Sequence, residues 1–322
     1  MNRIKVQDAD FVFLSYDEPN ADRNYADLKK KFPWAKRVHA VKGLDAAHKA
    51  CANISETERF ITIDADTIVD KNFLDVEIDL DALGLDNTYQ FSWCGKIAMN
   101  GLMYGNGSLK MWTKDFVKNM KTHEIHDGKD KNAIEFCHFP NYYQFNENYS
   151  TSYVNASPYQ AWRSGFREGV KMSIDRYVRV PRLKDIWWQN YHRLLVWMSV
   201  GADVENGLWA IYGARLGCYN ITCTDWDLMY TRDFQYLLEE WQSNPSGPIF
   251  HRNAILNEEN TLGRGHSKLT EEELITRITQ MGQDIKNREE IDIPVLPLTP
   301  EQSKFFKSVY MNSPRIFKKR TL

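Results

Sequence analysis

The chain has 322 residues, of which 43% are hydrophobic and 26% are charged, and its formal net charge is −2. This length suits about two domains, or one α/β domain with an appendage, and it allows a large core. A charge so close to zero excludes a global attraction to nucleic acid or to an anionic membrane, although a local basic patch is compatible with it.

The cysteines and the hydropathy pattern narrow the class of protein further. The five cysteines are odd in number, widely spread and without metal-type spacing, so the sequence predicts reduced thiols rather than a disulfide framework. The first residues lack the apolar segment of a signal peptide, and no apolar run reaches the length of a transmembrane helix. We therefore expect a cytoplasmic protein with no membrane partner.

The first part of the chain alternates between strand and helix patterns. A buried-type strand covers residues 11–16, a helix follows and stops at Pro33, and a second strand covers residues 38–41. Asp45 is placed to act as the N-cap of a second helix, which leads to a third strand over residues 60–63. Such alternation predicts right-handed crossovers and a parallel sheet.

The third strand runs directly into two carboxylates, Asp64 and Asp66. Ligands of open α/β sheets bind beyond the carboxyl ends of such strands. Two acids there are costly to desolvate unless a cation neutralises them, and a hard divalent metal with oxygen ligands is the natural candidate. The pattern Asp-x-Asp occurs four times in the chain, but only this copy follows a buried-type strand. The alternative is an ordinary solvated turn.

The strand ends carry acids rather than the glycine loops of other nucleotide-binding folds. No Gly-x-Gly-x-x-Gly follows the first strand, which argues against a dinucleotide-binding fold, and no Walker-type lysine loop is present. The N-terminal strand, the Asp45 helix and the ending Ile-Asp-Ala-Asp resemble the GT-A glycosyltransferase family. More narrowly, the chain resembles the DNA arabinosyl- and glucosyltransferases of T-even-type phages. The segments that carry this resemblance are Phe-Leu-Ser-Tyr-Asp-Glu-Pro-Asn, Pro-Trp-Ala-Lys-Arg-Val and Ala-Ala-His-Lys-Ala.

This resemblance implies a fold and a division into domains. It implies an α/β, GT-A-like (Rossmann-related) catalytic domain over residues 1–255, with a mostly parallel sheet and helices on both faces. A helical C-terminal extension over residues 256–322 would pack on that domain.

The resemblance also implies a reaction. The acid pair would hold Mn²⁺ or Mg²⁺ on the diphosphate of a nucleotide-sugar donor, with a UDP-sugar as the expected donor. The acceptor would be a 5-hydroxymethylated cytosine in phage DNA, which places the protein in the cytoplasm of an infected host cell. Two alternatives stay open: a glycosyltransferase with a glycan or lipid acceptor, and a module that binds nucleotide or DNA without turnover.

The resemblance assigns the sugar-donor site to the strand ends. Ser15, Tyr16 and Asp17, at the end of the first strand, would contact the nucleoside, and Asp45 would reach the ribose or the base. Asp64 would serve both the metal and the sugar donor, with Asp66 as a second metal ligand.

The middle of the chain supplies candidates for the acceptor side. A further strand is predicted over residues 88–93, and a glycine-rich loop follows over residues 100–108. In GT-A enzymes this loop lies near the donor sugar and the acceptor, so Asn106 and Gly107 are our candidates, with a plain hairpin turn as the alternative. Residues 121–156 lack a clean period, and this aromatic segment is our hypothesis for the acceptor side, as a lid or a poorly ordered loop.

Ser157 and Pro158 predict a helix start, as an N-cap followed by proline at the first helical position. Arg163 and Arg167 form a cationic stripe along this helix, which a diphosphate would neutralise or which is simply a solvated face. If the reaction inverts the anomeric centre, a carboxylate must deprotonate the acceptor hydroxyl, and Glu168 is our candidate for that base.

Helices are expected over the rest of the chain. They cover residues 184–200 and 203–216, the latter ended by Gly217, and Asp203 at its start is the second candidate base. Further helices cover 231–241, the stretch after the capping box of Thr270, and the stretch after Thr299. His251 follows a short apolar run and is the candidate third metal ligand, since GT-A enzymes often return a late histidine or acid to the metal, with a buried structural histidine as the alternative.

Overall fold

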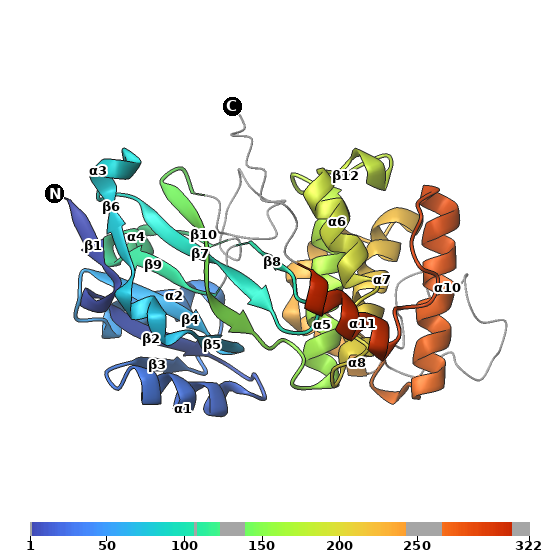
Figure 1. Cartoon of the computed structure of the whole chain (residues 1–322), viewed down its shortest axis with the longest axis horizontal. Helices are drawn as coiled ribbons and strands as arrows, with labels where there is room; N and C mark the ends of the chain where they lie inside the picture. Colours follow the sequence, from blue (N-terminus) through green and yellow to red (C-terminus); the bar gives the residue numbers. More distant parts are fainter. Residues whose placement is uncertain (1, 106–107, 123–138, 243–265, 311–322) are drawn as a thin grey trace. The chain divides into compact units, whose positions relative to one another are not determined.

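The computed structural model describes residues 2–105, 108–122, 139–242 and 266–310. The predicted site residues Asn106, Gly107 and His251 lie outside these ranges. The chain divides into two compact units, which we describe separately (Figure 1). Unit 1 comprises Met1–Ala98 and Met103–Tyr153, and unit 2 comprises Met99–Leu102 and Val154–Leu322.

Unit 1 is built on an eight-stranded sheet in the order β3-β2-β4-β9-β7-β10-β5, with β8 paired to β7. Strand β2 lies between β3 and β4 and runs parallel to both, as the sequence predicts. Strand β9 is antiparallel to β4 and to β7, so the sheet is mixed beyond β4 rather than mostly parallel. The α/β class is confirmed. The strands are β2 Asp10–Ser15, β3 Lys36–His39, β4 Arg59–Asp64, β5 Thr67–Val69, β7 Gln90–Ile97, β8 Met103–Tyr104, β9 Lys110–Thr113 and β10 Tyr142–Ser152.

Helices cover both faces of this sheet. Successive residues of a strand point to opposite faces, so one strand contributes side chains to a buried cluster on each face. Phe11 and Phe13 of β2 belong to one buried cluster, which includes Leu28 of helix α1. Val12 belongs to a second cluster, which includes Cys51 of helix α2. The helices of unit 1 are α1 Ala21–Lys31, α2 Leu44–Ile54, α3 Leu80–Leu83 and α4 Lys114–Asn119. A small sheet pairs β1 Arg3–Lys5 with β6 Glu77–Asp79.

The aromatic segment 121–156 contains a strand that the sequence pattern does not reveal. Its described part forms β10, which pairs in parallel with β7 and antiparallel with β5. Tyr143, Phe145 and Tyr149 pack against the core of unit 1, so these rings are part of the sheet's packing rather than of a lid. The register of β10 against β7 shifts twice, which breaks the simple alternation of a strand and hides it in the sequence.

Among the residues of unit 2 that the structure describes, the regular structure is helical apart from one short hairpin, β11 Ile174–Asp175 with β12 Val178–Arg179. Ser157 caps the first helix through the N–H of Gln160, and Pro158 takes its first position, as predicted. The capping boxes at Thr270 and Thr299 are also confirmed. The helices are α5 Pro158–Met172, α6 Trp188–Trp197, α7 Gly207–Cys223, α8 Phe234–Gln242, α10 Glu271–Glu289 and α11 Pro300–Val309, with 3-10 turns at Leu183–Asp185, Leu228–Arg232 and His266–Lys268. None of the described helices is both long and apolar enough to cross a membrane.

Helix α7 is the central element of unit 2, and its position corrects two sequence predictions. It begins at Gly207 and continues through Gly217 to Cys223, so Gly217 does not end it and Asp203 lies in the turn before it. Gly213 and Gly217 face the backbone of α5, where added Cβ atoms would lie 2.1 Å from Trp162 O and 2.3 Å from Phe166 O. These glycines therefore serve close helix packing rather than helix termination.

Buried Arg215 joins α7 to α10 and to the segment that follows α10. Its guanidinium donates hydrogen bonds to the carbonyl oxygens of Met198, Ile278 and Pro294, at 2.9, 2.8 and 2.8 Å. Burial lowers its pKa to about 10, so it stays cationic at neutral pH. Arg215 thus holds Met198, Ile278 and Pro294 to α7 in one core. The division between the two compact units falls at residue 153.

Candidate active site in unit 1

The parallel strands of unit 1 end together at one edge of the sheet. The ladders pair Leu14 with Asp64 and Ser15 with His39, so the last residues of β2, β3 and β4 are neighbours. This is the edge at which open α/β sheets bind ligands. The predicted strand-end residues of unit 1 are therefore brought together by the fold.

The turn that carries Asp64 and Asp66 is fixed by hydrogen bonds to its backbone. The side-chain amide of buried Asn24 donates to Ala65 O at 2.8 Å. The N–H of Tyr153 donates to Asp66 O at 2.7 Å, and Asn20 in turn donates to Tyr153 O at 2.9 Å. A turn held from both sides keeps its two carboxylates in a constant position, which preorganises a binding site.

Lys110 belongs to this site, although sequence reasoning did not find it. It begins strand β9, whose antiparallel pairing with β4 places Lys110 opposite Thr62. Its Nζ lies 3.6 Å from Asp64 Oδ2, with the lysine side chain 9% exposed and the carboxylate 46% exposed. A lone lysine in the apolar run Leu109–Trp112 was the available signal. The edge thus presents a cation as well as two acids.

The three residues predicted to contact the nucleoside differ in burial and in hydrogen bonding within unit 1. The hydroxyl of buried Ser15 accepts a hydrogen bond from Arg37 Nε at 2.8 Å and lies 3.0 Å from His39 Nδ1. The ring of Tyr16 is 49% exposed, and Asp17 is exposed beside it. Tyr16 therefore presents a ring face on which a base can stack, whereas Ser15 orders Arg37 and His39 at the strand ends.

Asp45 lies in the first turn of α2 and is not its N-cap, which corrects the sequence prediction. The helix begins at Leu44, and its N-cap is Gly43, whose φ of 91° is in the left-handed region that glycine tolerates. Asp45 instead pairs with Lys49 at 2.6 Å. On the same helix, burial lowers the pKa of His48, whose Nδ1 contacts Leu44 O, so this histidine is neutral at physiological pH.

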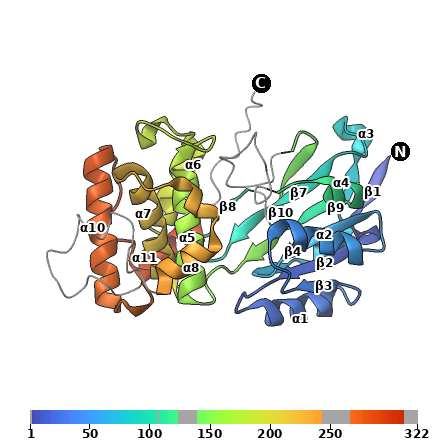
Figure 2. The ribbon, with the colours of Figure 1, turned by 180° about the vertical axis from the view of Figure 1, so that it is seen from behind.

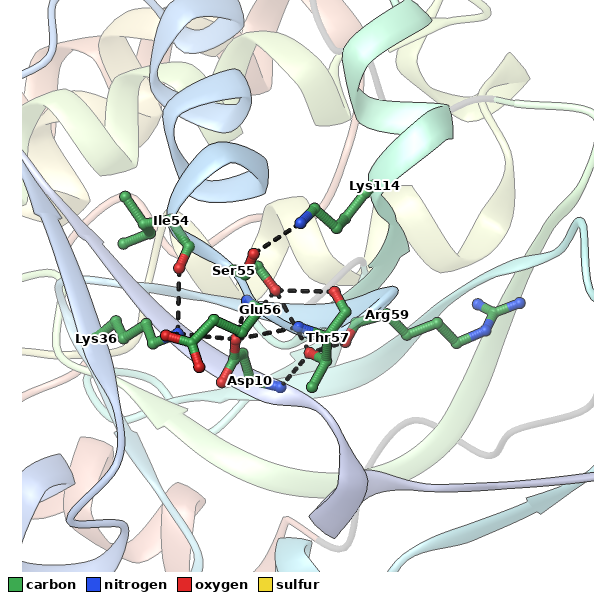
Figure 3. A network of polar contacts seen from close by, with 8 residues as sticks. All are labelled: Asp10, Lys36, Ile54, Ser55, Glu56, Thr57, Arg59 and Lys114. Carbon is green, nitrogen blue, oxygen red and sulfur yellow. Dashed lines mark hydrogen bonds and ion pairs between the residues drawn. The ribbon is translucent and has the colours of Figure 1, made fainter.

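The other Asp-x-Asp pairs contain acids with structural roles, which supports the choice of Asp64 and Asp66. Asp79 caps α3 through the N–H of Ala82, and Asp227 caps a 3-10 turn through the N–H of Met229. Asp10 lies at the opposite edge of the sheet, at the start of β2, in the polar network of Figure 3.

In that network a single oxygen, Asp10 Oδ2, accepts hydrogen bonds from Glu56 N at 2.5 Å, Lys36 Nζ at 3.0 Å and Ser55 Oγ at 3.2 Å (Figure 3). Burial alone would raise the pKa of Asp10, but these bonds outweigh it and lower the pKa. The amino edge of the sheet is thus a stability element, and the carboxyl edge carries the candidate site.

The donor set at Asp64 and Asp66 fits a hard divalent cation. Within the described ranges no group of three or more His, Cys, Asp or Glu side chains is arranged to hold a metal ion. Mg²⁺ commonly takes only one or two protein carboxylates and completes its shell with water and substrate phosphates. Thr67 Oγ1 donates to Asp66 Oδ1 at 3.1 Å, which orients that carboxylate. Two carboxylates are therefore a sufficient protein contribution.

The cationic stripe of α5 lies in unit 2, where its side chains pack on aromatic rings. The Arg163 guanidinium lies 5.0 Å from the centre of the Tyr159 ring and 5.3 Å from that of Phe234. Arg167 lies 5.0 Å from the centre of the Phe234 ring and donates to Thr231 O at 3.2 Å. These contacts are internal to unit 2, and the assignment of the stripe to a diphosphate stays a prediction.

The two candidate bases also lie in unit 2, and each has a cationic partner. Glu168 forms an ion pair with Lys171 one turn along α5. Asp203 forms an ion pair with Lys307 of α11 at 2.7 Å, and Lys307 also donates to Met99 O at 3.1 Å. Asp203 thus helps to hold the segment Met99–Leu102 within unit 2. Their catalytic role stays a prediction.

Comparisons with known proteins give limited likenesses. No protein-family model matches the chain, and no curated protein matches it. The chain is similar to HddC from Yersinia pseudotuberculosis at 15% identity and a TM-score of 0.26, over 45% of this chain and 74% of that one. It is also similar to a glycosyltransferase involved in the glycosylation of the major capsid of PBCV-1, at 12% identity and a TM-score of 0.27, over 45% of this chain and 94% of that one. Because these TM-scores are low, we base the function on the geometry of unit 1.

Proposed function

We propose that the chain is a metal-dependent glycosyltransferase that moves a sugar from a nucleotide-sugar donor to an acceptor hydroxyl. The observation that carries this proposal is the fixed turn of Asp64 and Asp66 at the carboxyl edge of the sheet, beside Lys110. Acids and a buried lysine together suit a ligand that carries both a divalent cation and phosphate groups.

The residues of unit 1 would divide the work of sugar-donor binding. Asp64 and Asp66 would hold Mn²⁺ or Mg²⁺, which when bound neutralises the charge that develops on the leaving diphosphate. Lys110 would add a second positive charge on the Asp64 side. The exposed ring of Tyr16 would stack on the base, with Asp17 beside it and Asp45 near the ribose.

The acceptor side of the proposal rests on the sequence resemblance. We propose a hydroxymethylated cytosine in DNA as acceptor, whose hydroxymethyl group projects into the major groove. Its oxygen would attack the anomeric carbon as the bond from that carbon to the diphosphate breaks and the nucleoside diphosphate leaves. In an inverting reaction a carboxylate takes the proton of the hydroxyl, and Glu168 and Asp203 are the candidates for that carboxylate. A glycan or lipid acceptor is the competing outcome.

Sugar-nucleotide turnover tests the proposal directly. The full chain would be incubated with Mn²⁺, a panel of radiolabelled sugar nucleotides, and duplex DNA with or without hydroxymethylcytosine or a glycan and lipid extract. We expect label to enter only the hydroxymethylated DNA. Asp66→Asn should reduce turnover by roughly a hundredfold or more, because the diphosphate loses its clamp. Exposed Asp75, in the same unit, supplies the control Asp75→Asn, which should match the wild type.

Three results would contradict the proposal in different ways. Full activity of Asp66→Asn in the presence of a chelator would show that the reaction needs no metal at Asp66. Label in the glycan or lipid extract alone would replace the acceptor. Metal-dependent nucleotide binding without hydrolysis or transfer on any acceptor would make the chain a binding module.

A further inference from the structure

One stretch of unit 2 is strongly basic although the whole chain is nearly neutral. Residues 176–193 contain five arginine and lysine side chains and one carboxylate, Asp185, whereas the net charge of the chain is −2. The stretch forms the tip of the β11–β12 hairpin, a 3-10 turn and the start of α6, which lie at the same end of unit 2 (Figures 1 and 2). We call four of its exposed residues, Arg176, Lys184, Trp187 and Trp188, the basic–aromatic surface.

The inner arginines of this stretch anchor its backbone. Arg179 donates to Thr224 O at 3.0 Å and to Asn220 O at 3.4 Å at the end of α7, where Asp225 and Asp227 also face it. Arg182 donates to the carbonyl oxygen of Arg288 of α10. The N–H of Leu183 donates to the buried carboxylate of Glu289 at 2.7 Å. The surface on either side of these anchors is consequently preformed, which lowers the entropy lost when a ligand binds.

The tip of the hairpin presents a cation at a strained position. Arg176 and Tyr177 have φ values of 46° and 66°, in the left-handed region. Two-residue hairpin turns of this kind favour Asn-Gly, because residues with larger side chains cost roughly 1–2 kcal/mol each in this conformation. Such strain clusters at functional positions, and here it places exposed Arg176 at the tip of the hairpin.

The start of α6 presents two consecutive tryptophans to solvent. Trp187 is 39% exposed and Trp188 is 48% exposed, and the Arg193 guanidinium lies 5.6 Å from the centre of the Trp187 ring. Exposed indole rings between cations are the composition of sites that bind unpaired nucleic-acid strands, where bases stack on aromatic faces and phosphates meet lysine and arginine. Leu194, Val196 and Trp197 of α6 are buried in unit 2, so most of the apolar side of this helix is used in packing and is not free to insert into a lipid surface.

We infer that the basic–aromatic surface binds an unpaired DNA strand, with phosphates at Arg176 and Lys184 and a base stacked on Trp188. The inference rests on the proposed DNA acceptor, because taking a base out of its stack leaves unpaired strand in the substrate. The surface would bind through phosphate charge and base stacking, so we expect little preference for the base sequence of the strand.

Binding of a fluorescein-labelled single-stranded oligodeoxynucleotide to the full chain tests the inference. Fluorescence anisotropy would be measured over a series of salt concentrations, without metal or sugar nucleotide. The double variant Arg176→Gln, Lys184→Gln should lower the slope of log affinity against log salt by about 1.4, because each phosphate contact with a single strand contributes about 0.7. Trp188→Ala should weaken binding by roughly tenfold, with less quenching of tryptophan fluorescence.

Matched controls come from elsewhere in unit 2. Lys268→Gln, Lys304→Gln removes the same charge from exposed positions, and Phe305→Ala removes an exposed aromatic ring. Both controls should bind as the wild type does. A slope in the first double variant equal to that of the wild type would overturn the inference, and so would binding to phosphatidylserine vesicles without binding to DNA. Sugar-nucleotide hydrolysis would be followed with the same protein preparations in separate samples that contain Mn²⁺ and a sugar nucleotide. Its absence from the wild type refutes the proposed function, whereas unchanged DNA binding refutes this surface alone.

Discussion

Replacing Lys110 by methionine tests whether the candidate site binds both a divalent cation and a diphosphate, because the two ligands should respond in opposite directions. The substitution keeps most of the length and apolar character of the side chain and removes its positive charge. Lys110 is 8% exposed, and its Nζ lies 3.6 Å from Asp64 Oδ2. The ammonium group should attract a bound diphosphate and repel a divalent cation at Asp64. Lys110→Met is therefore expected to weaken binding of a nucleoside diphosphate and to strengthen binding of Mn²⁺ alone.

The size of the effect follows from this distance and from the exposure of Asp64. Two unit charges 3.6 Å apart interact by about 1 kcal/mol in water and by about 5 kcal/mol at an effective dielectric constant of about 20. Asp64 is 46% exposed, so solvent screening brings the value toward the lower figure. We expect each affinity to change by about 1–2 kcal/mol, a factor of roughly 5 to 30.

Isothermal titration calorimetry measures both affinities. Mn²⁺ would be titrated without nucleotide, and uridine diphosphate would be titrated without metal. Lys110→Arg keeps the charge and should stay close to the wild type, and Lys118→Met removes an exposed charge of α4 as a control. If Lys110→Met changes neither affinity, or changes both in the same direction, Lys110 does not act between metal and diphosphate as argued.

Two further predictions concern the stability of the fold. Asp10→Asn should destabilise the protein by about 2 kcal/mol at neutral pH, because Asp10 Oδ2 accepts charge-assisted bonds from Lys36 and from the backbone. The pKa of Asp10 is lowered, so its contribution is present above its ordinary value of 3.8 and is lost as the pH falls through the lower native value. Urea unfolding at successive pH values should show the difference between variant and wild type shrinking in acid, and a constant difference would contradict this reading. Gly213→Ala should destabilise by about 1–3 kcal/mol, because the new Cβ would lie 2.1 Å from Trp162 O. The control Ala46→Gly, at an exposed position of α2, measures the helix-propensity difference between alanine and glycine, about 1 kcal/mol, by which alanine would otherwise stabilise the helix. A Gly213→Ala variant as stable as the wild type would refute close packing of α5 and α7.

Local chemistry in the sequence was enough to predict the elements that depend on neighbouring residues. Helix starts at Ser157, Thr270 and Thr299 are confirmed because a cap needs only a side chain and an N–H within one turn. The strand that ends at Asp64 is confirmed for the same reason, since its apolar run and its acids are contiguous. The α/β class follows from the order of these elements.

The tertiary structure decided what depends on residues far apart in the chain. Lys110 reaches Asp64 because β9 pairs with β4 across 46 residues, and no local pattern encodes that partner. Gly217 continues its helix because the backbone of α5 packs against it, whereas the same residue beside water would end one. The sequence alone therefore determined which strand ends in acids. Only the tertiary structure decided which residues lie beside those acids and which glycines lie inside a helix, because the pairing of β9 with β4 and the packing of α5 on α7 join residues far apart in the chain.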